Sequence, residues 1–129
     1  QVKRALAGEL GTVMRDEMKP NYLAHGPGRQ AILDLCMQMA EDLGSQVFAD
    51  QSEAIKTRPD QRETLRAVSV PTLILCGRED RLCPIERHTL MQELIPHSNL
   101  VVIDGAGHLP TLEKPSETNE ALSAWLNQS

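Results

Sequence analysis

The sequence is poor in aromatic side chains and has no run of basic residues. Only 2% of its 129 residues are aromatic, and 13 Lys and Arg against 18 Asp and Glu give a net charge of −5. Nucleic acids and anionic membranes bind clustered cations, so this balance argues against both as partners. Hydrophobic residues make up 40% of the chain, which is typical of one soluble domain or part of one.

Long hydrophobic segments and recognisable cysteine pairs are also missing. The longest apolar stretch, residues 70–76, is far shorter than the roughly 20 residues that span a bilayer, so no membrane-spanning segment is expected. Three cysteines without a CxxC pair favour a reducing compartment, and hence the cytoplasm, over a disulfide scaffold. The chain has no initiating Met, and Gln1 already lies in a helical pattern. We therefore expect a piece of a longer chain.

The pattern of the chain changes near Ala67. Residues 1–67 show helical spacing without a convincing strand, whereas residues 68–129 alternate strand, helix, strand and helix. Three helices are expected in the first half, with inward faces formed by Val2, Leu6, Leu10, Val13 and Met14, then by Ile32, Leu35, Cys36, Met39 and Leu43, then by Val47, Phe48, Gln51 and Ile55.

Local signals set the ends of these helices. Gly44 is expected to end the second helix, and Pro59 forces the residue before it out of the helical region. A short fourth helix is expected to begin at a capping box formed by Asp60 and Glu63. The first half is thus predicted to be entirely helical.

The second half predicts an α/β fold with a parallel β-α-β-α unit. Residues 68–76 are apolar without alternation, as in a strand buried on both faces, and residues 100–103 form the second strand. A helix opens at Pro84 between them. A last helix starts at Pro115, with Ala121, Leu122, Trp125 and Leu126 expected to face inward. A right-handed crossover brings the carboxyl ends of both strands to one edge of the sheet.

Asp80 and His108 are the candidate catalytic residues. Asp80 comes four residues after the first predicted strand and His108 five residues after the second. Ligands of open α/β sheets bind outside these strand ends. An acid and an imidazole placed there suit the orienting acid and the base of a nucleophilic triad. The alternative is that Asp80 stabilises a turn and His108 is a surface residue.

Other chemistry-bearing residues point to no further site. Cys76, Cys83 and His88 have a spacing that superficially suggests a metal site or a redox pair. No fourth ligand follows, however, and Cys76 ends a buried strand as a small apolar residue. Neither a metal nor a cofactor is therefore expected. Glu113 is expected at the start of the last helix, where a carboxylate suits the helix dipole.

Residues 70–84, 94–108 and 113–115 resemble the C-terminal third of an α/β-hydrolase-fold enzyme. The first segment reads Val-Pro-Thr-Leu-Ile-Leu-Cys-Gly-Arg-Glu-Asp, and the second ends in Gly-Ala-Gly-His. The resemblance implies that Asp80 is the acid and His108 the base of the family's catalytic triad. It also implies that the helices of the first half, residues 1–67, are the remnant of a helical cap.

The nucleophile of that family is missing from the sequence. No Gly-x-Ser-x-Gly motif is present. Ser45 follows a glycine but lacks the second one and comes after a helix, so it is expected to act as a helix N-cap. The chain is therefore predicted to be a C-terminal fragment that carries two of three catalytic residues and is inactive alone.

The resemblance implies a parent enzyme that hydrolyses a small carboxylic ester, in the manner of small-molecule esterases and carrier-protein methyl-ester hydrolases. Dehalogenase chemistry or cleavage of a carbon–carbon bond occurs on the same fold and stays open. The alternative to an enzyme is that the chain is a non-catalytic interaction module. Two strands leave unpaired backbone groups at both edges, so we also expect the chain to dimerise or self-associate.

Overall fold

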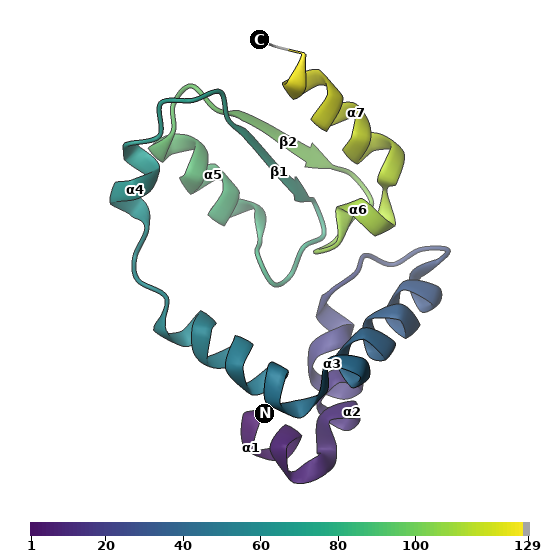
Figure 1. The fold of residues 1–129 in the computed structure, drawn as a ribbon. Helices are drawn as coiled ribbons and strands as arrows, with labels where there is room; N and C mark the ends of the chain where they lie inside the picture. The colour runs from purple at the N-terminus through teal and green to yellow at the C-terminus, as the bar shows by residue number, and fades with distance from the viewer. Residues whose placement is uncertain (128–129) are drawn as a thin grey trace. The chain divides into compact units, whose positions relative to one another are not determined.

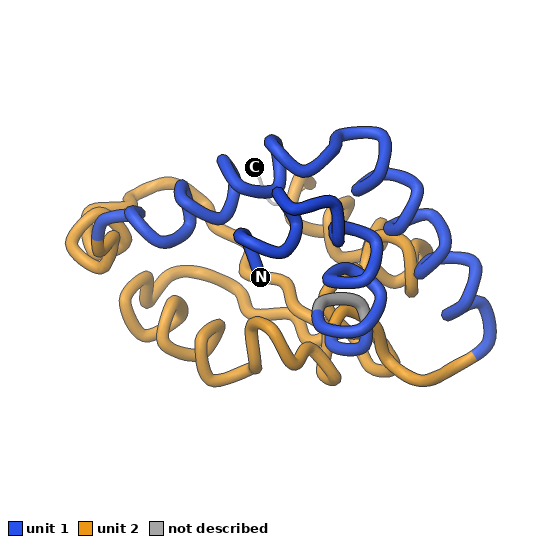
Figure 2. The backbone as a smooth tube through the Cα atoms, turned by 90° about the horizontal axis from the view of Figure 1, so that it is seen from below, with its two compact units in different colours: residues 1–21, 27–59 blue, residues 22–26, 60–129 orange. Residues whose placement is uncertain are grey.

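The computed structural model describes residues 1–127, apart from the side chains of residues 18 and 19, and it folds as two compact units. The first unit comprises residues 1–21 and 27–59, and the second comprises residues 22–26 and 60–129 (Figure 2). The first is helical, whereas the second combines two strands with helices (Figure 1). Among the helices described, none is both long and apolar enough to cross a membrane.

The first unit consists of short helical segments that contact one long helix. The long helix is α3 (Arg29–Thr57), and the segments in contact with it are α1 (Val2–Arg4), η1 (Ala5–Glu9), α2 (Leu10–Val13) and η2 (Met14–Met18). The turn η3 (Lys19–Asn21) follows. Gly8, with φ of 95°, interrupts the expected first helix. As a result Leu6 is exposed, contrary to the prediction, while Ala5 and Leu10 are buried.

The long helix changes direction at Gly44, which has φ of 81° and ψ of 174°. This confirms the predicted helix end, and the extended Arg58 before Pro59 confirms the second one. The predicted buried face is wrong, because Leu33 is buried while Leu35, Met39 and Leu43 expose 42%, 53% and 56% of their surface. Gln51 and Ile55 are exposed as well. Apolar residues surround this helix on several sides, so spacing alone did not identify the side that meets the neighbouring segments.

The second unit contains the predicted parallel strand pair. The strands are β1 (Leu73–Gly77) and β2 (Asn99–Ile103), which pair in parallel with Leu73 opposite Asn99 and Gly77 opposite Ile103. Helix α5 (Ile85–Leu94) makes the crossover and contacts both strands. The remaining helices are α4 (Arg62–Arg66), α6 (Pro110–Glu113) and α7 (Pro115–Leu126). In Figure 1, α5 and α7 lie to the two sides of the strand pair.

The first strand is shorter than predicted. Ladder pairing begins only at Leu73, since Pro71 has no N–H and the N–H of Val68 closes the turn after α4 by donating to Leu65. Its burial alternates instead of covering both faces, with Ile74 buried and Leu73 half-buried. The pleat therefore turns only one face of β1 into the core of the described residues.

The start of α4 and the buried face of α7 also differ from their predictions. Helix α4 begins at Arg62, so Asp60 lies before the cap position, where its carboxylate accepts the N–H of Arg62 at 3.0 Å. The side chain of Arg62 lowers the pKa of Asp60 to about 2. In α7 the inward stripe is Thr118, Ala121 and Trp125, whereas Leu122 and Leu126 are exposed.

Candidate active site

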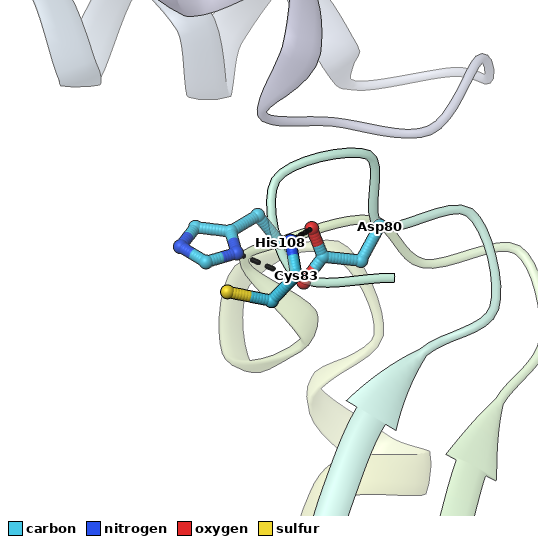
Figure 3. A group of neighbouring side chains, drawn as sticks. All are labelled: Asp80, Cys83 and His108. Atoms are coloured by element: carbon cyan, nitrogen blue, oxygen red, sulfur yellow. Dashed lines mark hydrogen bonds and ion pairs between the residues drawn. The ribbon is translucent and has the colours of Figure 1, made fainter. Parts of the chain in front are cut away.

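Asp80 and His108 meet at the carboxyl edge of the two strands. Asp80 follows β1 and His108 follows β2, and parallel pairing brings both loops to one edge of the sheet. The Nδ1 atom of His108 lies 2.9 Å from Oδ2 of Asp80 (Figure 3). The Asp80 side chain is 5% exposed, whereas that of His108 is 36% exposed. The two residues singled out by the sequence thus form a hydrogen-bonded pair with a shielded acid and an accessible imidazole.

A tight turn orients the carboxylate of Asp80. Its Oδ1 atom accepts hydrogen bonds from the backbone N–H groups of Leu82 and Cys83, each at 2.9 Å. The N–H of Asp80 donates to the carbonyl oxygen of Gly77 at 3.3 Å. Because Oδ1 is held by the turn, Oδ2 is the atom that faces the imidazole.

Backbone hydrogen bonds continue from the strands into the two loops. The N–H of Arg78 donates to the carbonyl oxygen of Ile103, and the N–H of Glu79 donates to that of Ala106, both at 2.9 Å. The side chains of Arg78 and Asp104 form an ion pair between the same loops. These contacts fix the loop of Asp80 against the loop of His108.

Glycines permit the close approach of these loops. A Cβ atom on Gly77 would lie only 2.1 Å from the carbonyl oxygen of Gly107. A Cβ atom on Gly107 would lie 2.8 Å from the backbone nitrogen of Ala24 and equally close to the carbonyl oxygen of Tyr22. Larger residues at either position would therefore push the backbone segments apart.

Glu113 holds the loop of His108, a role that the sequence analysis missed. Its Oε1 atom accepts the N–H of Ala24 at 2.7 Å, and its Oε2 atom accepts the N–H groups of Gly107 at 2.9 Å and Leu109 at 3.0 Å. Glu113 ends α6 and does not start the last helix, so its predicted role at a helix dipole is wrong. The sequence signal that could have indicated this role is the Glu-Lys-Pro segment, residues 113–115, which begins five residues after His108.

The segment of residues 22–26 is the second support that the sequence did not reveal. The backbone N–H of His108 donates to the carbonyl oxygen of Tyr22 at 2.6 Å. The rings of the two residues lie 6.2 Å apart, centroid to centroid, with an interplanar angle of 36°. These contacts link residues that are distant in sequence, and no local pattern predicts them.

The structure groups potential metal ligands differently from their sequence spacing. Asp80, Cys83 and His108 each place one ligand atom within 4.8 Å of the other two (Figure 3). In the described residues neither Cys76 nor His88 belongs to such a group. Cys76 is 2% exposed in β1, and its burial, together with the charge of Asp80, raises the pKa of its thiol.

The pair has the geometry of an orienting acid and a base. An ionised Asp80 favours the imidazole tautomer that carries its proton on Nδ1. The unprotonated Nε2 of His108 is then the atom that can accept a proton from a nucleophile. Ser45 lies on α3 in the first unit, and the Gly-x-Ser-x-Gly motif is missing from the sequence.

The comparisons with known proteins agree with this arrangement of strands and loops. The family model of the alpha/beta hydrolase fold matches residues 16–115, a stretch that includes Asp80 and His108. The chain therefore belongs to the alpha/beta hydrolase family.

Esterases are among its relatives. The pimeloyl-(acyl-carrier protein) methyl ester esterase of Klebsiella pneumoniae is 35% identical over 100 residues, which cover 78% of this chain and 37% of that protein. The 3-oxoadipate enol-lactonase 1 of Acinetobacter baylyi is 32% identical over 90 residues, 70% of this chain and 33% of that protein. The chain thus spans about a third of the length of these curated relatives.

A solved structure shows the same fold over nearly the whole chain. The thermophilic esterase from Thermogutta terrifontis, with malate bound, superposes with a TM-score of 0.81 and 31% sequence identity. The match covers 98% of this chain and 49% of that esterase. The predicted fold class, an α/β-hydrolase fold of which this chain forms a part, is confirmed.

Proposed function

We propose that this chain supplies the acid and the base of an acyl-transfer hydrolase whose substrate is a small carboxylic ester. One observation carries the proposal: Nδ1 of His108 and Oδ2 of Asp80 lie 2.9 Å apart at the carboxyl edge of β1 and β2, in a member of the alpha/beta hydrolase family. The esterases among the relatives support an ester as the substrate class.

Each residue then has a defined step. Nε2 of His108 takes the proton of a serine hydroxyl, whose oxygen attacks the ester carbonyl, and the imidazolium returns that proton to the leaving alcohol. In the second half of the reaction His108 takes a proton from water as the water oxygen attacks the acyl-serine carbonyl. The bond from the acyl carbon to the serine oxygen then breaks, the imidazolium returns the proton to that oxygen, and the acid product leaves. Asp80 keeps Nδ1 protonated and stabilises the imidazolium. We assign the serine to a longer protein that contains this chain, and we expect the 129-residue chain alone to be inactive.

We assign residues 1–67 to the remnant of a helical cap, because every element described in this range is helical and precedes β1 in the chain. A reducing compartment such as the cytoplasm remains our prediction from the cysteine content. Self-association of the isolated chain is supported by Leu35, Met39 and Leu43, which recur every four residues on α3 and are all exposed.

The test is ester hydrolysis by a longer protein that contains this chain, measured with a p-nitrophenyl ester. We expect His108→Ala and Asp80→Asn each to lower kcat by about 10⁴-fold, as removal of a triad member does elsewhere. His88→Ala is the matched control, since His88 lies on α5 outside the pair, and it should keep wild-type turnover. Wild-type turnover in a folded His108→Ala variant would contradict the proposal, as would hydrolysis by the isolated 129-residue chain.

A further inference from the structure

Cys83 lies beside the acid–base pair, and the proposed reaction gives it no role. Its Sγ atom, one carboxylate oxygen of Asp80 and one ring nitrogen of His108 lie within 4.8 Å of one another. Figure 3 shows the thiol next to the imidazole, on the residue that ends the turn of Asp80. A thiol, an imidazole and a carboxylate therefore converge at one point.

Two of these three groups are held in position by the backbone. The backbone N–H groups of Leu82 and Cys83 donate to Oδ1 of Asp80, so the other oxygen, Oδ2, faces His108. The backbone of His108 is tied to the carbonyl oxygen of Tyr22 at 2.6 Å. Hydrogen bonds of this kind around a ligand set orient the ligands and raise the affinity of a metal. The Sγ atom of Cys83 moves by rotation about a single side-chain bond.

The ligand types and charges select a class of ion. Soft thiolate together with imidazole and carboxylate suits Zn²⁺ or Cd²⁺ and not Mg²⁺ or Ca²⁺, which take oxygen ligands. A thiolate and a carboxylate balance the charge of a divalent cation. Zinc–ligand bonds of about 2.0 to 2.3 Å place the ligand atoms of a tetrahedral site roughly 3.3 to 3.8 Å apart. The three atoms lie within 4.8 Å of one another, so binding requires the Cys83 side chain to rotate toward the other two ligands.

Exposure is consistent with an open site that exchanges metal with solvent. Asp80 is buried, the His108 side chain is 36% exposed and Cys83 is exposed. Three protein ligands leave the fourth tetrahedral position to water, as in zinc sites that are accessible from outside. Such an ion enters without unfolding the loops.

We propose that Asp80, Cys83 and His108 form a reversible binding site for Zn²⁺ or a similarly soft divalent cation, and that its occupancy switches off the base of the proposed hydrolase. Binding releases the thiol proton of Cys83 to solvent. If Nδ1 of His108 binds the ion, the hydrogen bond to Asp80 is lost, and if Nε2 binds it, the base itself is blocked. The inhibitory consequence rests on the proposed function, whereas the metal site does not.

The metal site is tested by titrating the 129-residue chain with Cd²⁺ and following the ultraviolet charge-transfer band of cadmium thiolate. We expect one ion per chain and a loss of affinity in Cys83→Ser of more than about 100-fold, because loss of outer-shell partners alone costs 10- to 100-fold. His108→Gln should also weaken binding. Cys36→Ser is the matched control, because Cys36 lies on α3 in the first unit, and it should keep the band.

A folded chain that shows no saturable band, or a Cys83→Ser variant that binds like wild type, would overturn the metal site. Circular dichroism of each variant establishes that it is folded. In the longer hydrolase, we expect Zn²⁺ to inhibit turnover and a chelator to restore it. Metal binding without any ester hydrolysis would overturn the proposed function and leave the site standing, whereas hydrolysis unaffected by saturating Zn²⁺ would overturn the inhibitory role.

Discussion

At the scale of single residues, the carboxylate of Glu113 holds the loop of His108 by hydrogen bonds to the backbone on both sides of the histidine. It accepts three backbone N–H groups, one from residues 22–26 and two from the residues on either side of His108. The backbone N–H groups of a loop have no hydrogen-bond partner in a strand or helix. The carboxylate of Glu113 accepts three such groups and so provides the hydrogen bonds that regular secondary structure would otherwise provide. The position of His108 therefore depends on a residue that never meets the substrate in the proposed reaction.

We predict that Glu113→Gln destabilises the chain by about 2 kcal/mol, because hydrogen bonds to charged groups contribute about 1.5 to 3 kcal/mol and an amide nitrogen cannot accept them. Urea unfolding followed by circular dichroism measures this change. Glu117→Gln is the control, since Glu117 is an exposed carboxylate on α7 with only a 3.8 Å pairing to Lys114. An equal effect of both variants would show that the three hydrogen bonds of Glu113 contribute nothing special.

Cys83 illustrates at the same scale what sequence spacing misses. Spacing grouped it with Cys76 and His88, whereas folding places it with Asp80 and His108. Cys76 belongs to a strand and is buried in the core. Its seven-residue separation from Cys83 therefore does not predict that the two thiols bind one ion. A set of metal ligands that comes from two loops can be recognised only in the folded structure, because strand pairing brings the two loops together.

At the scale of elements, the order of strands and helices was predictable and the buried faces were not. The β-α-β-α order, the parallel pairing, the change of direction at Gly44 and the C-terminal end of α3 follow from apolar runs, glycines and prolines. In α3 and α7, however, the apolar residues exceed what one face can bury, and the neighbours decide which ones are covered. Leu122 and Leu126 were assigned inward for this reason, although Thr118 is the buried residue of α7.

The junction between β1 and the loop of His108 gives a prediction at this scale. In Gly77→Ala the new methyl group would lie 2.1 Å from the carbonyl oxygen of Gly107, a backbone atom that cannot rotate away. We expect a loss of about 3 kcal/mol, at the upper end of the cost of overpacking, together with displacement of the loop. Thermal or urea unfolding measures the loss.

Gly26→Ala provides the comparison for this substitution. A Cβ atom on Gly26 meets nothing within 4 Å, so the change should stay within about 0.5 kcal/mol of the wild-type stability. If Gly77→Ala were as stable as Gly26→Ala, the close approach of the two loops would not describe the protein in solution.

At the scale of the whole molecule, the surface carries several large exposed apolar side chains. On α3, Leu35, Met39 and Leu43 are exposed by 42%, 53% and 56%. In the described residues the sheet has two strands, so each strand has one edge without a partner strand. Exposed strand edges and apolar stripes both promote association of copies.

We therefore predict that the 129-residue chain self-associates at micromolar concentration, as measured by size-exclusion chromatography with light scattering. Leu43→Glu should shift the chain toward the monomer, because it places a charge in the exposed apolar stripe. Gln38→Glu adds the same charge at an exposed position of the same helix and should change nothing. A monomeric wild-type chain would refute self-association, and equal effects of the two variants would exclude the stripe as its interface.

The sequence by itself determined the fold class, the strand order and the two residues of the candidate pair. These features depend on local signals: apolar runs long enough for strands, glycines and prolines that end helices, and the rule that parallel strands bring their carboxyl ends to one edge. Asp80 and His108 could be singled out because each lies in the loop that follows a strand. Only the tertiary structure decided what surrounds them.

The support by Glu113, the contact with residues 22–26 and the place of Cys83 beside the imidazole all join segments far apart in the chain. The same holds for the faces that α3 and α7 bury. Hydrogen bonds and packing between such segments depend on relative positions that no periodicity encodes, because each contact exists only after both partners have been brought together.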